Sequence, residues 1–412
     1  MKDFAQSEDP AVQRQLDRLA ALSLPQGRFG LETIRELLAR LDNPQDRLPP
    51  VFHVAGTNGK GSTCAFLRAM LEAQGLTVHA ATKPHLVRYN ERIRIAGKLV
   101  SDTELASLLG EVLDKGEDLA PSFFEVTTAA IFLAFSRHRA DACVIEVGLG
   151  GRLDATNVIP QPAACGIASL GIDHEAFLLR PEDGVPDDPL CRIAFEKASI
   201  ARPGVPLVTQ EYPLAVARTV IEVAQQAGAR PAMRELDWFV DYRGGNLVYR
   251  DRFGELTLPR PALLGEHQAD NAALAVAMLR HQNRVTVSPE AMAEGIRAAR
   301  WPARLQLLAE GPLTALVPGR KVWLDGGHNP DAGAALGRFF GRRPGEGPAP
   351  QVHLIIGMLA NKDPSAILAP LKLRLLSVSV VPAPGHEAHS PQDFVAHTDL
   401  PVRSFANVAD AL

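Results

Sequence analysis

The sequence predicts an α/β protein, in which a large and mostly parallel sheet flanked by helices is followed by a smaller α/β domain. Stretches rich in valine and isoleucine alternate with helical stretches through most of the 412 residues, which is typical of parallel α/β layers. A proline in RWPARLQ interrupts the helical pattern, after which the alternation begins again. The length also favours two domains over a single core.

The larger domain is predicted over residues 1–299. Its expected strands cover residues 50–54, 77–82, 141–147, 163–169 and 205–209. Residues 60–74 show helical spacing of apolar side chains and stop at Gly75, which favours a helix with a C-terminal glycine. A further helix is expected from Ser101, where SDTE offers a capping box, and two more at residues 266–282 and 288–299.

A hinge is expected at residues 300–305, and the second domain at residues 306–412. There a strand (KVWLDGG), a helix (DAGAALGRFF), a strand (QVHLIIGM), a helix and a strand (LSVSVVPA) follow one another. This order predicts a small, Rossmann-like α/β domain. Residues 341–350, GRRPGEGPAP, are expected to form a surface loop.

Composition excludes several classes of protein. There are 43 basic and 47 acidic residues, a net charge of -4, and no basic stripe, so no nucleic-acid partner is expected. The N-terminal stretch lacks the apolar segment of a signal peptide, and the apolar runs are far shorter than the ~20 residues that cross a bilayer. We therefore expect a cytoplasmic protein without membrane association. Four cysteines without a CxxC pair favour core packing over disulfides or a zinc site.

The stretch GTNGKGS, residues 56–62, lies between an expected strand and an expected helix. Backbone N–H groups and the helix dipole favour an anion at such a place. Lys60 adds a charge for the terminal phosphates of a nucleotide, and Ser62 or Thr63 adds a hydroxyl for Mg²⁺. A glycine-rich turn without a ligand is the alternative. The order of strand, turn, lysine and helix favours a P-loop-type site, although Gly61 separates the lysine from the serine.

Two strand ends carry candidate metal ligands. In VIEVGLGGRLDATN, Glu146 lies near the end of an apolar strand, and ligands of open parallel sheets bind outside the carboxyl ends of the strands. A carboxylate there can hold a metal that bridges phosphates, or it can be an ordinary surface residue. In SLGIDHEAF, Asp173 and His174 end another strand, which makes His174 a candidate ligand at the same crevice.

Two further stretches are less informative by themselves. IAFEKASI places Glu196 and Lys197 on an expected short helix, where both side chains could simply be solvated. WLDGGHNPDAG puts Asp325 and His328 in a strand-to-helix turn. A structural turn explains the glycines of that stretch but leaves His328 without a role.

In this order, the motifs resemble the folylpolyglutamate synthase and dihydrofolate synthase family, of the bacterial bifunctional type, within the Mur ligase superfamily. The resemblance implies an ATP-dependent amide ligase that adds L-glutamate to dihydropteroate and to tetrahydrofolate. The γ-phosphate passes to the carboxylate of the acid, and L-glutamate displaces phosphate from the acyl phosphate. The sequence DATN favours the dihydrofolate synthase activity, and a monomer is expected. The matching stretches are HVAGTNGKGS, PHLVRYNERIRI, FFEVTTAAIFLAF, VIEVGLGGRLDATNVI, GIDH, IAFEKASI, GEHQADNAALA, WPARLQ and DGGHNPDA.

The resemblance also implies roles for single residues. ATP binding is assigned to Thr57, Asn58, Gly59, Lys60, Gly61, Ser62, Asn271, Arg304, Asp325 and His328. Metal binding, with two Mg²⁺ expected, is assigned to Ser62, Glu146, His174 and a carbamylated Lys197. The folate pocket is assigned to Phe124, Arg152, Asp154 and Ala155, and catalysis to Lys60, His174 and Lys197.

The sequence departs from the family at two places. Lys83 stands before PHL, where the family usually has a serine that helps to coordinate Mg²⁺, and a protonated amine cannot coordinate a metal. The lysine could turn away while water replaces the hydroxyl, contact phosphate or the substrate carboxylate, or weaken the metal site. Residues 175–191 are longer than in the family and are expected to form an acidic, proline-rich surface excursion.

Three other functions fit parts of the pattern. The chain could have folylpolyglutamate synthase activity only. It could be a ligase-like protein that binds ATP and folate but has impaired turnover because of Lys83. A phosphotransferase or nucleotide hydrolase would consume ATP without an amine acceptor.

Overall fold

The computed structural model describes residues 6–22, 30–341 and 350–412, so residues 342–349 of the expected surface loop lie outside it. The chain divides into two compact units. The first comprises Met1–Ala262 and Ala269–Ala299, and the second comprises Leu263–Gln268 and Arg300–Leu412. The short segment 263–268 thus precedes the end of the first unit in sequence but belongs to the second.

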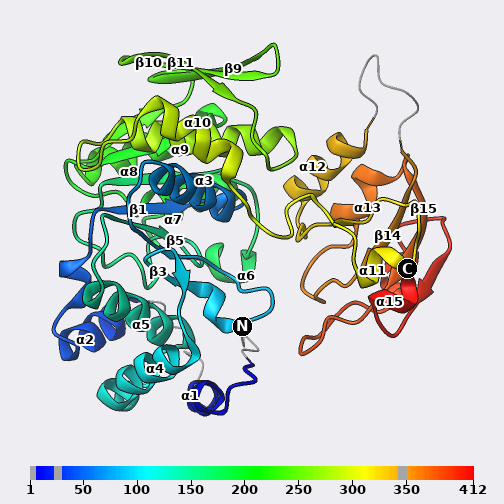
Figure 1. The fold of residues 1–412 in the computed structure, drawn as a ribbon, viewed down its shortest axis with the longest axis horizontal. Coiled ribbons are helices and arrows are strands. Elements are labelled where there is room, and N and C mark those ends of the chain that lie inside the picture. Colours follow the sequence, from blue (N-terminus) through cyan, green and yellow to red (C-terminus); the bar gives the residue numbers. More distant parts are fainter. Residues whose placement is uncertain (1–5, 23–29, 342–349) are drawn as a thin grey trace. The chain divides into compact units, whose positions relative to one another are not determined.

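An eight-stranded sheet forms the centre of the first unit, in the order β4-β3-β2-β5-β1-β6-β7-β8 (Figure 1). The strands from β2 to β8 in this order are parallel, and β3 and β4 are antiparallel additions at one edge. The five predicted strands are all present, and the predicted α/β class is confirmed. The bounds are β1 Val51–Ala55, β2 Val78–Ala81, β3 Ile93–Ile95, β4 Lys98–Leu99, β5 Ala142–Glu146, β6 Ala164–Ile167, β7 Pro206–Thr209 and β8 Arg230–Met233.

Helices cover both faces of this sheet. On one face, α5, α7 and α8 pack against the apolar side chains of the central strands. On the other face lies α9, whose Met278 packs on Gly166 of β6. The bounds are α1 Pro10–Ala21, α2 Glu32–Arg40, α3 Lys60–Ala73, α4 Asp102–Gly116, α5 Phe123–Arg137, α6 Glu175–Leu178, α7 Pro189–Ala198, α8 Leu214–Gln226, α9 Glu266–Arg280 and α10 Pro289–Ala298.

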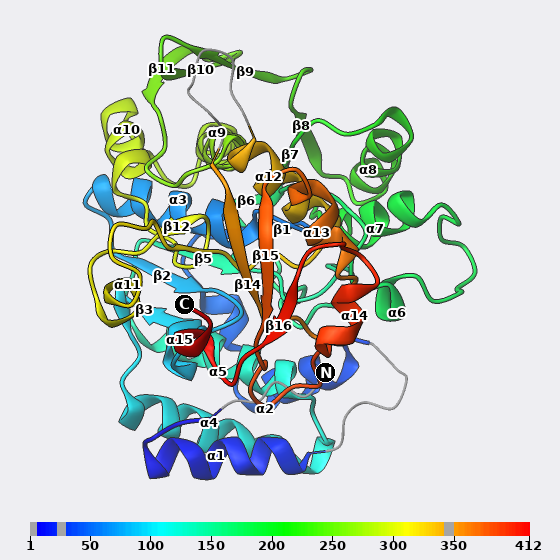
Figure 2. The same ribbon diagram turned by 90° about the vertical axis from the view of Figure 1, so that its right-hand side faces the viewer.

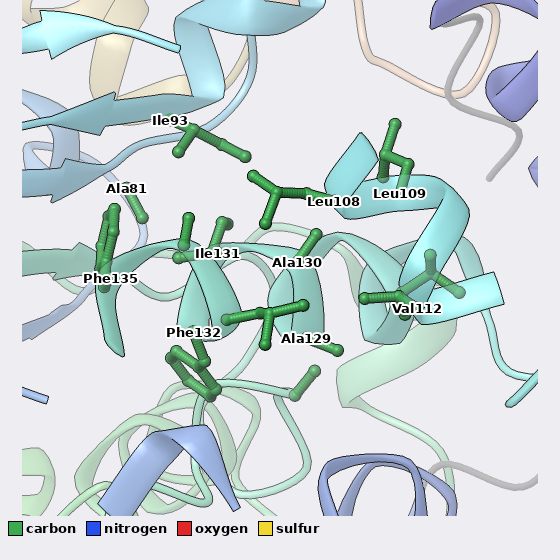
Figure 3. Packing of buried hydrophobic residues seen from close by; sticks show 14 of the residues in the cluster. Ala81, Ile93, Leu108, Leu109, Val112, Ala129, Ala130, Ile131, Phe132 and Phe135 are labelled. Atoms are coloured by element: carbon green, nitrogen blue, oxygen red, sulfur yellow. The ribbon is translucent and has the colours of Figure 1, made fainter. Parts of the chain in front are cut away.

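The main core of the first unit lies where α4 and α5 pack together. Figure 3 shows Leu108 and Val112 of α4 beside Ala129 and Ala130 of α5. On the sheet side, Ile93 of β3 joins the same cluster. Small residues on α5 let the two helices approach closely, which favours the dense packing typical of protein interiors.

Only one of the two hydrogen bonds of the capping box predicted at Ser101 is present. Ser101 Oγ accepts the Glu104 N–H at 3.2 Å, as a capping residue should. The Glu104 carboxylate does not return to the backbone of Ser101, because it bonds to His138 Nε2 at 2.6 Å. A complete capping box occurs one helix later, where Ser122 and Glu125 begin α5.

An antiparallel sheet of three strands was not foreseen from the sequence. It consists of β9 Trp238–Arg243, β10 Asn246–Asp251 and β11 Gly254–Pro259 (Figure 1). Gly244 and Gly245 have φ values of 57° and 81° in the connection between β9 and β10. A pair of glycines between alternating strands is a hairpin signal, and this signal was available in WFVDYRGGNLVYRD.

The second unit contains a parallel sheet in the order β14-β15-β16, whose strands run side by side in Figure 2. The strand predicted from KVWLDGG is reduced to the two residues of β13, Trp323–Leu324. In the described part of the chain, β13 pairs antiparallel with β12, Gln306–Leu307, instead of joining the parallel sheet. The other bounds are α11 Pro312–Ala315, α12 Pro330–Phe340, β14 Val352–Ile356, α13 Ser365–Leu371, β15 Leu375–Val380, α14 Pro391–Val395, β16 Val402–Ser404 and α15 Val408–Ala411.

The structure also bears on two expectations from the sequence, which concern membrane-spanning helices and the cysteines. Among the residues placed by the structure, no helix is both long enough and apolar enough to cross a membrane. The four cysteines are free and buried, and burial raises the pKa of the Cys143 and Cys165 thiols. These two thiols therefore behave as core packing groups rather than as reactive nucleophiles.

We expect Gly295→Ala to destabilise the first unit, although alanine is the better helix former. A Cβ at Gly295 of α10 would lie 2.4 Å from the Cα and 2.5 Å from the N of Met70 on α3. The two helices would have to separate, at a cost of about 1–3 kcal/mol in the free energy of unfolding. Gly110→Ala in α4 is the matched control. Its Cβ would meet only the Gln15 side chain at 3.5 Å, so we expect a gain of roughly 0.5–1 kcal/mol. Urea unfolding of both variants measures the difference, and equal stabilities would contradict the helix contact.

Candidate active site

The glycine-rich loop lies between β1 and α3, at the carboxyl end of a strand in the middle of the sheet. Gly56 and Gly59 have φ values of 148° and 83°, which favour glycine. A Cβ at Gly59 would also lie 2.3 Å from Asn271 Oδ1 of α9. The loop thus requires glycine for its conformation and for space, and Asn271 of α9 lies directly against it.

The segment that follows β6 holds the loop in place. The Thr57 N–H donates to Ser169 O at 2.7 Å, and Thr57 Oγ1 donates to Gly171 O at 2.8 Å. The hydroxyl also accepts the Gly171 N–H at 3.1 Å, and Ser169 Oγ donates to Asn58 O at 3.2 Å. Thr57 therefore shapes the loop through both its backbone N–H and its hydroxyl.

Lys60 begins α3 and turns back over the loop. Its Nζ donates to Gly56 O at 2.9 Å and to Thr57 O at 3.0 Å. Ser62 and Thr63 are buried in the first turn of the helix together with Gly61. Within the described residues, Thr63 Oγ1 has no hydrogen-bond partner. A positive charge, a helix N-terminus and small side chains thus meet at this loop, and this combination suits a phosphate group.

Glu146 ends β5, the strand between β1 and β2, and lies in register with Val54 of β1. Its side chain is only 3 % exposed. Glu146 Oε2 accepts the backbone N–H of Lys83 at 3.0 Å. The carboxylate is therefore buried beside the glycine-rich loop, so Glu146 is not an ordinary surface residue.

Asp173 and His174 follow β6, after the residues that hold the loop. His174 has a φ of 55° and is the N-terminal capping residue of α6. The His174 N–H donates to Asp173 Oδ1 at 2.7 Å. The left-handed backbone conformation of a non-glycine residue is uncommon and marks this turn as locally strained.

Lys197 is buried on α7, with 4 % of its surface exposed, so the alternative of a solvated side chain is wrong. Burial, and next the charge of Lys60, lower the pKa of Lys197 to about 7, although Asp173 and Asp154 oppose this change. The amine is therefore close to half neutral at pH 7. The charges of Lys60 and Asp173 both act on Lys197, so its amine lies near the glycine-rich loop and the turn at Asp173.

The loop after β5 packs directly on α7. A Cβ at Gly151 would lie 2.5 Å from Glu196 O and 3.0 Å from Lys197 Cα, and the Arg152 N–H donates to Glu196 O at 2.7 Å. The Arg152 guanidinium binds Glu182 through two hydrogen bonds of 2.9 and 2.6 Å, and its Nε binds Glu196 at 3.1 Å. The predicted folate ligand Arg152 is thus engaged by carboxylates of the protein itself.

Asp154 lies in the same loop, and hydrogen bonds surround its carboxylate. Oδ2 accepts the N–H groups of Gly148 and Leu149, both at 2.9 Å. Oδ1 accepts Thr156 N–H at 3.0 Å and Thr156 Oγ1 at 2.5 Å. Burial opposes the charge of Asp154, but Lys83 and these hydrogen bonds outweigh it and hold its pKa below the ordinary value.

A buried histidine continues this network into the sheet. His53 Nε2 of β1 lies 2.8 Å from Thr156 Oγ1. Because the hydroxyl gives its single proton to Asp154, His53 Nε2 is the donor in this contact. Burial lowers the pKa of His53 to about 3, so the ring stays neutral at physiological pH. His53 thereby links the Asp154 loop to the central strand.

Phe124 and Ala155, the other two residues of the expected folate pocket, lie on different elements. Phe124 is in the first turn of α5, with its ring centroid 5.4 Å from that of Phe123. Ala155 is buried next to Asp154 and belongs to the same core cluster as α5. The fold thus brings the start of α5 and the Asp154 loop to a common region of the first unit.

The remaining predicted ATP ligands form a group of their own within the second unit. Asp325 Oδ2 accepts the Leu305 N–H at 2.7 Å, and Oδ1 accepts the Gly327 N–H at 2.7 Å. Arg304 Nη1 donates to Ala303 O at 2.7 Å. His328 Nδ1 lies 2.9 Å from Gly326 O. The turn after β13 therefore gathers Arg304, Asp325 and His328 before α12 begins.

The pairing of Glu182 with Arg152 and Arg192 was missed. Glu182 lies in the long segment between α6 and α7, and its Oε2 accepts from Arg192 Nη2 at 2.8 Å as well as from Arg152. The acidic, proline-rich composition of this segment predicts a surface excursion. The partners are separated in sequence, so only the fold, and no local pattern, could have shown that they meet.

The potential metal ligands are spread over several elements. In the part of the chain that the structure describes, no group of three or more His, Cys, Asp or Glu side chains could hold a metal ion by itself. A site that shares its metal with phosphate oxygens needs fewer protein ligands, and Mg²⁺ is commonly held by one or two carboxylates plus phosphates. The arrangement around Glu146 fits this second kind of site.

Comparisons with known proteins decide the family. No family model matches the chain. The dihydrofolate synthase/folylpolyglutamate synthase of Bacillus subtilis is 37 % identical over 331 residues, which cover 76 % of this chain and 72 % of the relative. The chain belongs to the dihydrofolate synthase/folylpolyglutamate synthase family. The family expected from the motifs is thereby confirmed, and with it the assignment as an ATP-dependent ligase.

Solved structures of family members agree in fold. Escherichia coli FolC in complex with DHPP and ADP has a TM-score of 0.84 and 32 % identity, covering 98 % of this chain and 91 % of that one. A bifunctional folylpolyglutamate synthase/dihydrofolate synthase with Mn, AMPPNP and L-glutamate bound has a TM-score of 0.81 and 32 % identity, covering 97 % and 90 %. The likeness extends over both units.

Proposed function

We propose that the protein joins L-glutamate to dihydropteroate, and also to tetrahydrofolate, in an ATP-dependent reaction through an acyl phosphate. The observation that carries this proposal is the grouping of the glycine loop, Lys60, Glu146 and buried Lys197 at the carboxyl edge of one sheet. DHPP with ADP in one relative, and AMPPNP with L-glutamate in another, support the choice of substrates.

We assign ATP binding to residues 1–299 and glutamate ligation to residues 306–412, with residues 300–305 as a hinge. Residues 57–62 hold the triphosphate, with Lys60 at its terminal phosphates, and Asn271 supports the loop from α9. Arg304, Asp325 and His328 are the ATP ligands of the second unit. The pocket for the acid is assigned to Phe124, Arg152, Asp154 and Ala155, of which Arg152 and Asp154 also shape the loop after β5.

The donor groups suit Mg²⁺. Glu146 supplies a buried carboxylate, and Ser62 supplies a hydroxyl in the first turn of α3; such hard oxygen donors are the ligands that Mg²⁺ prefers. Mn with AMPPNP in a relative supports a divalent ion beside the nucleotide. When bound, the ion neutralises phosphate charge. We propose two Mg²⁺, the second held by His174 and Lys197.

Lys197 can contribute to a metal site only if its amine is modified. Its pKa of about 7 leaves a substantial neutral fraction at physiological pH. The ammonium group first loses one proton; the neutral amine then attacks the carbon of CO₂ and releases a second proton, which leaves a carbamate anion in place of a cation. We therefore propose that Lys197 is carbamylated in the active enzyme.

The chain's residues then act mainly by positioning and charge. An oxygen of the acid carboxylate attacks the γ-phosphorus, ADP leaves, and the glutamate amine attacks the acyl carbon and expels phosphate. The backbone N–H groups of the loop and Lys60 balance the charge that shifts to ADP. The loop is held by Thr57 and Ser169, so this alignment exists before the substrate binds.

Phosphate release from ATP in the presence of Mg²⁺ and L-glutamate tests the proposal. We expect release with dihydropteroate and with tetrahydrofolate, and a product that is heavier by one glutamyl residue in mass spectrometry. Release with tetrahydrofolate alone would show folylpolyglutamate synthase activity only. Release without an acid would indicate a nucleotide hydrolase, whereas ATP and folate binding by calorimetry without release would indicate a protein that has lost turnover. A monomer by light scattering and a cytoplasmic location remain predictions.

A further inference from the structure

A pocket of about 680 Å³ lies in the first unit, away from the glycine-rich loop. It is bounded by residues of β7, β8, β9 and β10 and by the end of α9, among them Pro206, Ala232, Phe239, Asp251 and His281, and we call it the β8 pocket. In Figure 2, β8 lies beside β7 and leads to β9. Small-molecule sites commonly have volumes of about 300–1,000 Å³, so the β8 pocket is large enough for such a ligand.

The β8 pocket and the glycine-rich loop lie at opposite edges of the central sheet. Pro206 is the first residue of β7, and residues 230–232 begin β8. The glycine-rich loop follows the carboxyl end of β1, and β1, β6, β7 and β8 are parallel. A strand of four residues is roughly 13 Å long. A ligand in the β8 pocket therefore leaves the ATP site free.

Part of the pocket wall is apolar, and it is formed by Pro206, Pro231, Ala232, Leu236 and Phe239. Leu236 remains 68 % exposed, although leucine side chains are usually buried. Phe239 and Arg250 stand opposite each other in the pairing of β9 with β10, so both side chains lie on the same face of the small sheet. The wall thus offers apolar surface for a ring, with a guanidinium group directly beside it.

Asp251 lines the pocket, but its charge is balanced within the protein. Its Oδ2 accepts from Arg280 Nε at 2.7 Å and from the Tyr249 hydroxyl at 3.1 Å. Its Oδ1 accepts from Arg280 Nη2 at 2.6 Å and from the Phe253 N–H at 2.8 Å. A carboxylate has about four acceptor positions. Asp251 is therefore fully hydrogen-bonded, and Arg280 neutralises its charge.

Two arginines at the pocket have no carboxylate partner among the residues that the structure describes. Arg230 Nε donates to Gly204 O at 2.9 Å. The guanidinium Cζ of Arg252 lies 4.7 Å from the ring centroid of Phe253. Both arginine side chains are exposed, and a guanidinium group has five N–H donors. Most donors of these two groups are therefore available to a ligand.

The other charged residues of the wall leave an excess of positive charge. Arg250 is paired with Asp241 at 2.9 Å. Asp237 supplies a negative charge, and its Oδ2 accepts the Met233 N–H at 2.8 Å. This carboxylate stands against the two arginines that lack a carboxylate partner. The balance of the wall therefore favours an anion.

His281 is the part of the wall that α9 contributes. The residue is 9 % exposed, and its Nε2 has no hydrogen-bond partner within the described ranges. Asp251 Oδ2 lies 3.7 Å away, which is beyond hydrogen-bond distance. Burial lowers the pKa of His281, although Asp251 opposes the change, so the ring is neutral at pH 7 and carries one N–H donor. Buried polar atoms are usually hydrogen-bonded, and an unpartnered ring nitrogen beside a pocket therefore points to a ligand.

We propose that the β8 pocket is a second ligand site, which binds a small organic anion: a carboxylate or phosphate ester that carries an apolar ring. Arg230 and Arg252 bind the charged group, since guanidinium groups match the geometry of both oxyanions. His281 offers a further donor, and Phe239 and the prolines contact the ring. The site takes no part in the ligation, so this inference does not depend on the proposed function.

Ligand-observed NMR titrations of the full chain with phenyl phosphate, benzoate and benzyl alcohol test the site. AMPPNP, Mg²⁺, dihydropteroate and L-glutamate are present to occupy the catalytic site. We expect at least one of the two anions to bind with a Kd on the order of 1 mM, as is usual for ligands of this size, and benzyl alcohol to bind more weakly. The tighter of the two anions gives the class of the natural ligand.

Substitutions in the wall locate the binding. Arg230→Gln and Arg252→Gln should each weaken the binding of the anion about 5-fold, the upper end for one exposed ion pair, and leave benzyl alcohol unaffected. Arg243→Gln is the matched control, because Arg243 is exposed on the same small sheet and pairs with Asp241 at 3.0 Å but does not line the pocket. It should bind every probe as the wild type does. Phe239→Ala should weaken the binding of all three ring-bearing probes.

Four outcomes would overturn the inference. Neither anion could bind while the catalytic site is occupied, or the double variant Arg230→Gln/Arg252→Gln could bind them as tightly as the wild type. Inorganic phosphate could bind as tightly as phenyl phosphate, which would show that the ring makes no contact. Benzyl alcohol could match both anions, which would leave an apolar cavity without selectivity for charge.

Discussion

Lys197→Met should lower the rate of ligation by about 10²–10³-fold, the usual cost of removing one group that stabilises transferring charge. The variant should at the same time fold more stably than the wild type at neutral and acidic pH. The wild type buries Lys197 with a pKa of about 7, whereas the unfolded chain has the ordinary value of about 10.4. A buried amine therefore opposes folding whenever the unfolded chain would protonate it.

The pH dependence follows from these two pKa values. Between pH 7 and about 10.4 the unfolded state binds more protons than the folded state, so the stability of the wild type rises with pH across this window. Below pH 7 the amine is charged in both states and the full penalty remains. The advantage of Lys197→Met should be largest there and fade towards pH 10.

Urea unfolding of the two proteins at pH 6 and pH 9, without CO₂ or nucleotide, measures this difference. Lys197→Arg is the control for charge. It keeps a cation that cannot lose its proton or form a carbamate, so it should be inactive and less stable than Lys197→Met. An active Lys197→Arg enzyme would remove the argument for a carbamylated lysine.

Gly151→Ala should cost about 10²-fold in turnover, because small displacements of catalytic groups have effects of this size. The added Cβ would lie 2.5 Å from Glu196 O and 3.0 Å from Lys197 Cα. Both are backbone atoms, so a side-chain rotation cannot relieve the contact. The loop and α7 would have to separate and strain the hydrogen bond from Arg152 N to Glu196 O, at 2.7 Å. We also expect a loss of about 1–3 kcal/mol in stability.

Gly184→Ala provides the comparison for Gly151→Ala. Gly184 lies in the segment between α6 and α7, and a Cβ there meets nothing within 4 Å, although its φ is 76°. This variant should lose roughly 1 kcal/mol through backbone strain and keep its turnover. Equal effects on kcat in the two variants would mean that the contact with α7 is unimportant for the reaction.

The parallel sheet and the glycine loop were predictable because their signals are local. The strand before GTNGKGS and the helix after it are visible in a few residues, as is Glu146 at the end of an apolar run. Lys197 shows the limit of such reasoning. In its segment IAFEKASI the two charged residues stand among apolar ones and could be solvated on one face of a helix, and only the packing of α7 on the sheet shows that the amine is buried.

Asp154 shows a second limit. The family resemblance predicts that its carboxylate lies in the folate pocket. The sequence could not show that Thr156 and two backbone N–H groups would surround this carboxylate. The short strand β13 illustrates a third. The apolar residues of KVWLDGG predict a strand, but its pairing partner depends on which distant segment of the chain lies beside it in the fold. Patterns predict elements well and contacts between distant elements poorly.

The anchoring of the glycine-rich loop after β1 has a consequence for the order of folding. Thr57 is held by Gly171, 114 residues later, and Asn58 by Ser169, 111 residues later. The strand β1 likewise pairs with β5 and β6, both far along the chain. Contacts of such long range form late, because a large loop must close first. During synthesis, the nucleotide site therefore cannot be completed until the turn after β6 has left the ribosome, so a newly made chain should gain its affinity for ATP only after that point.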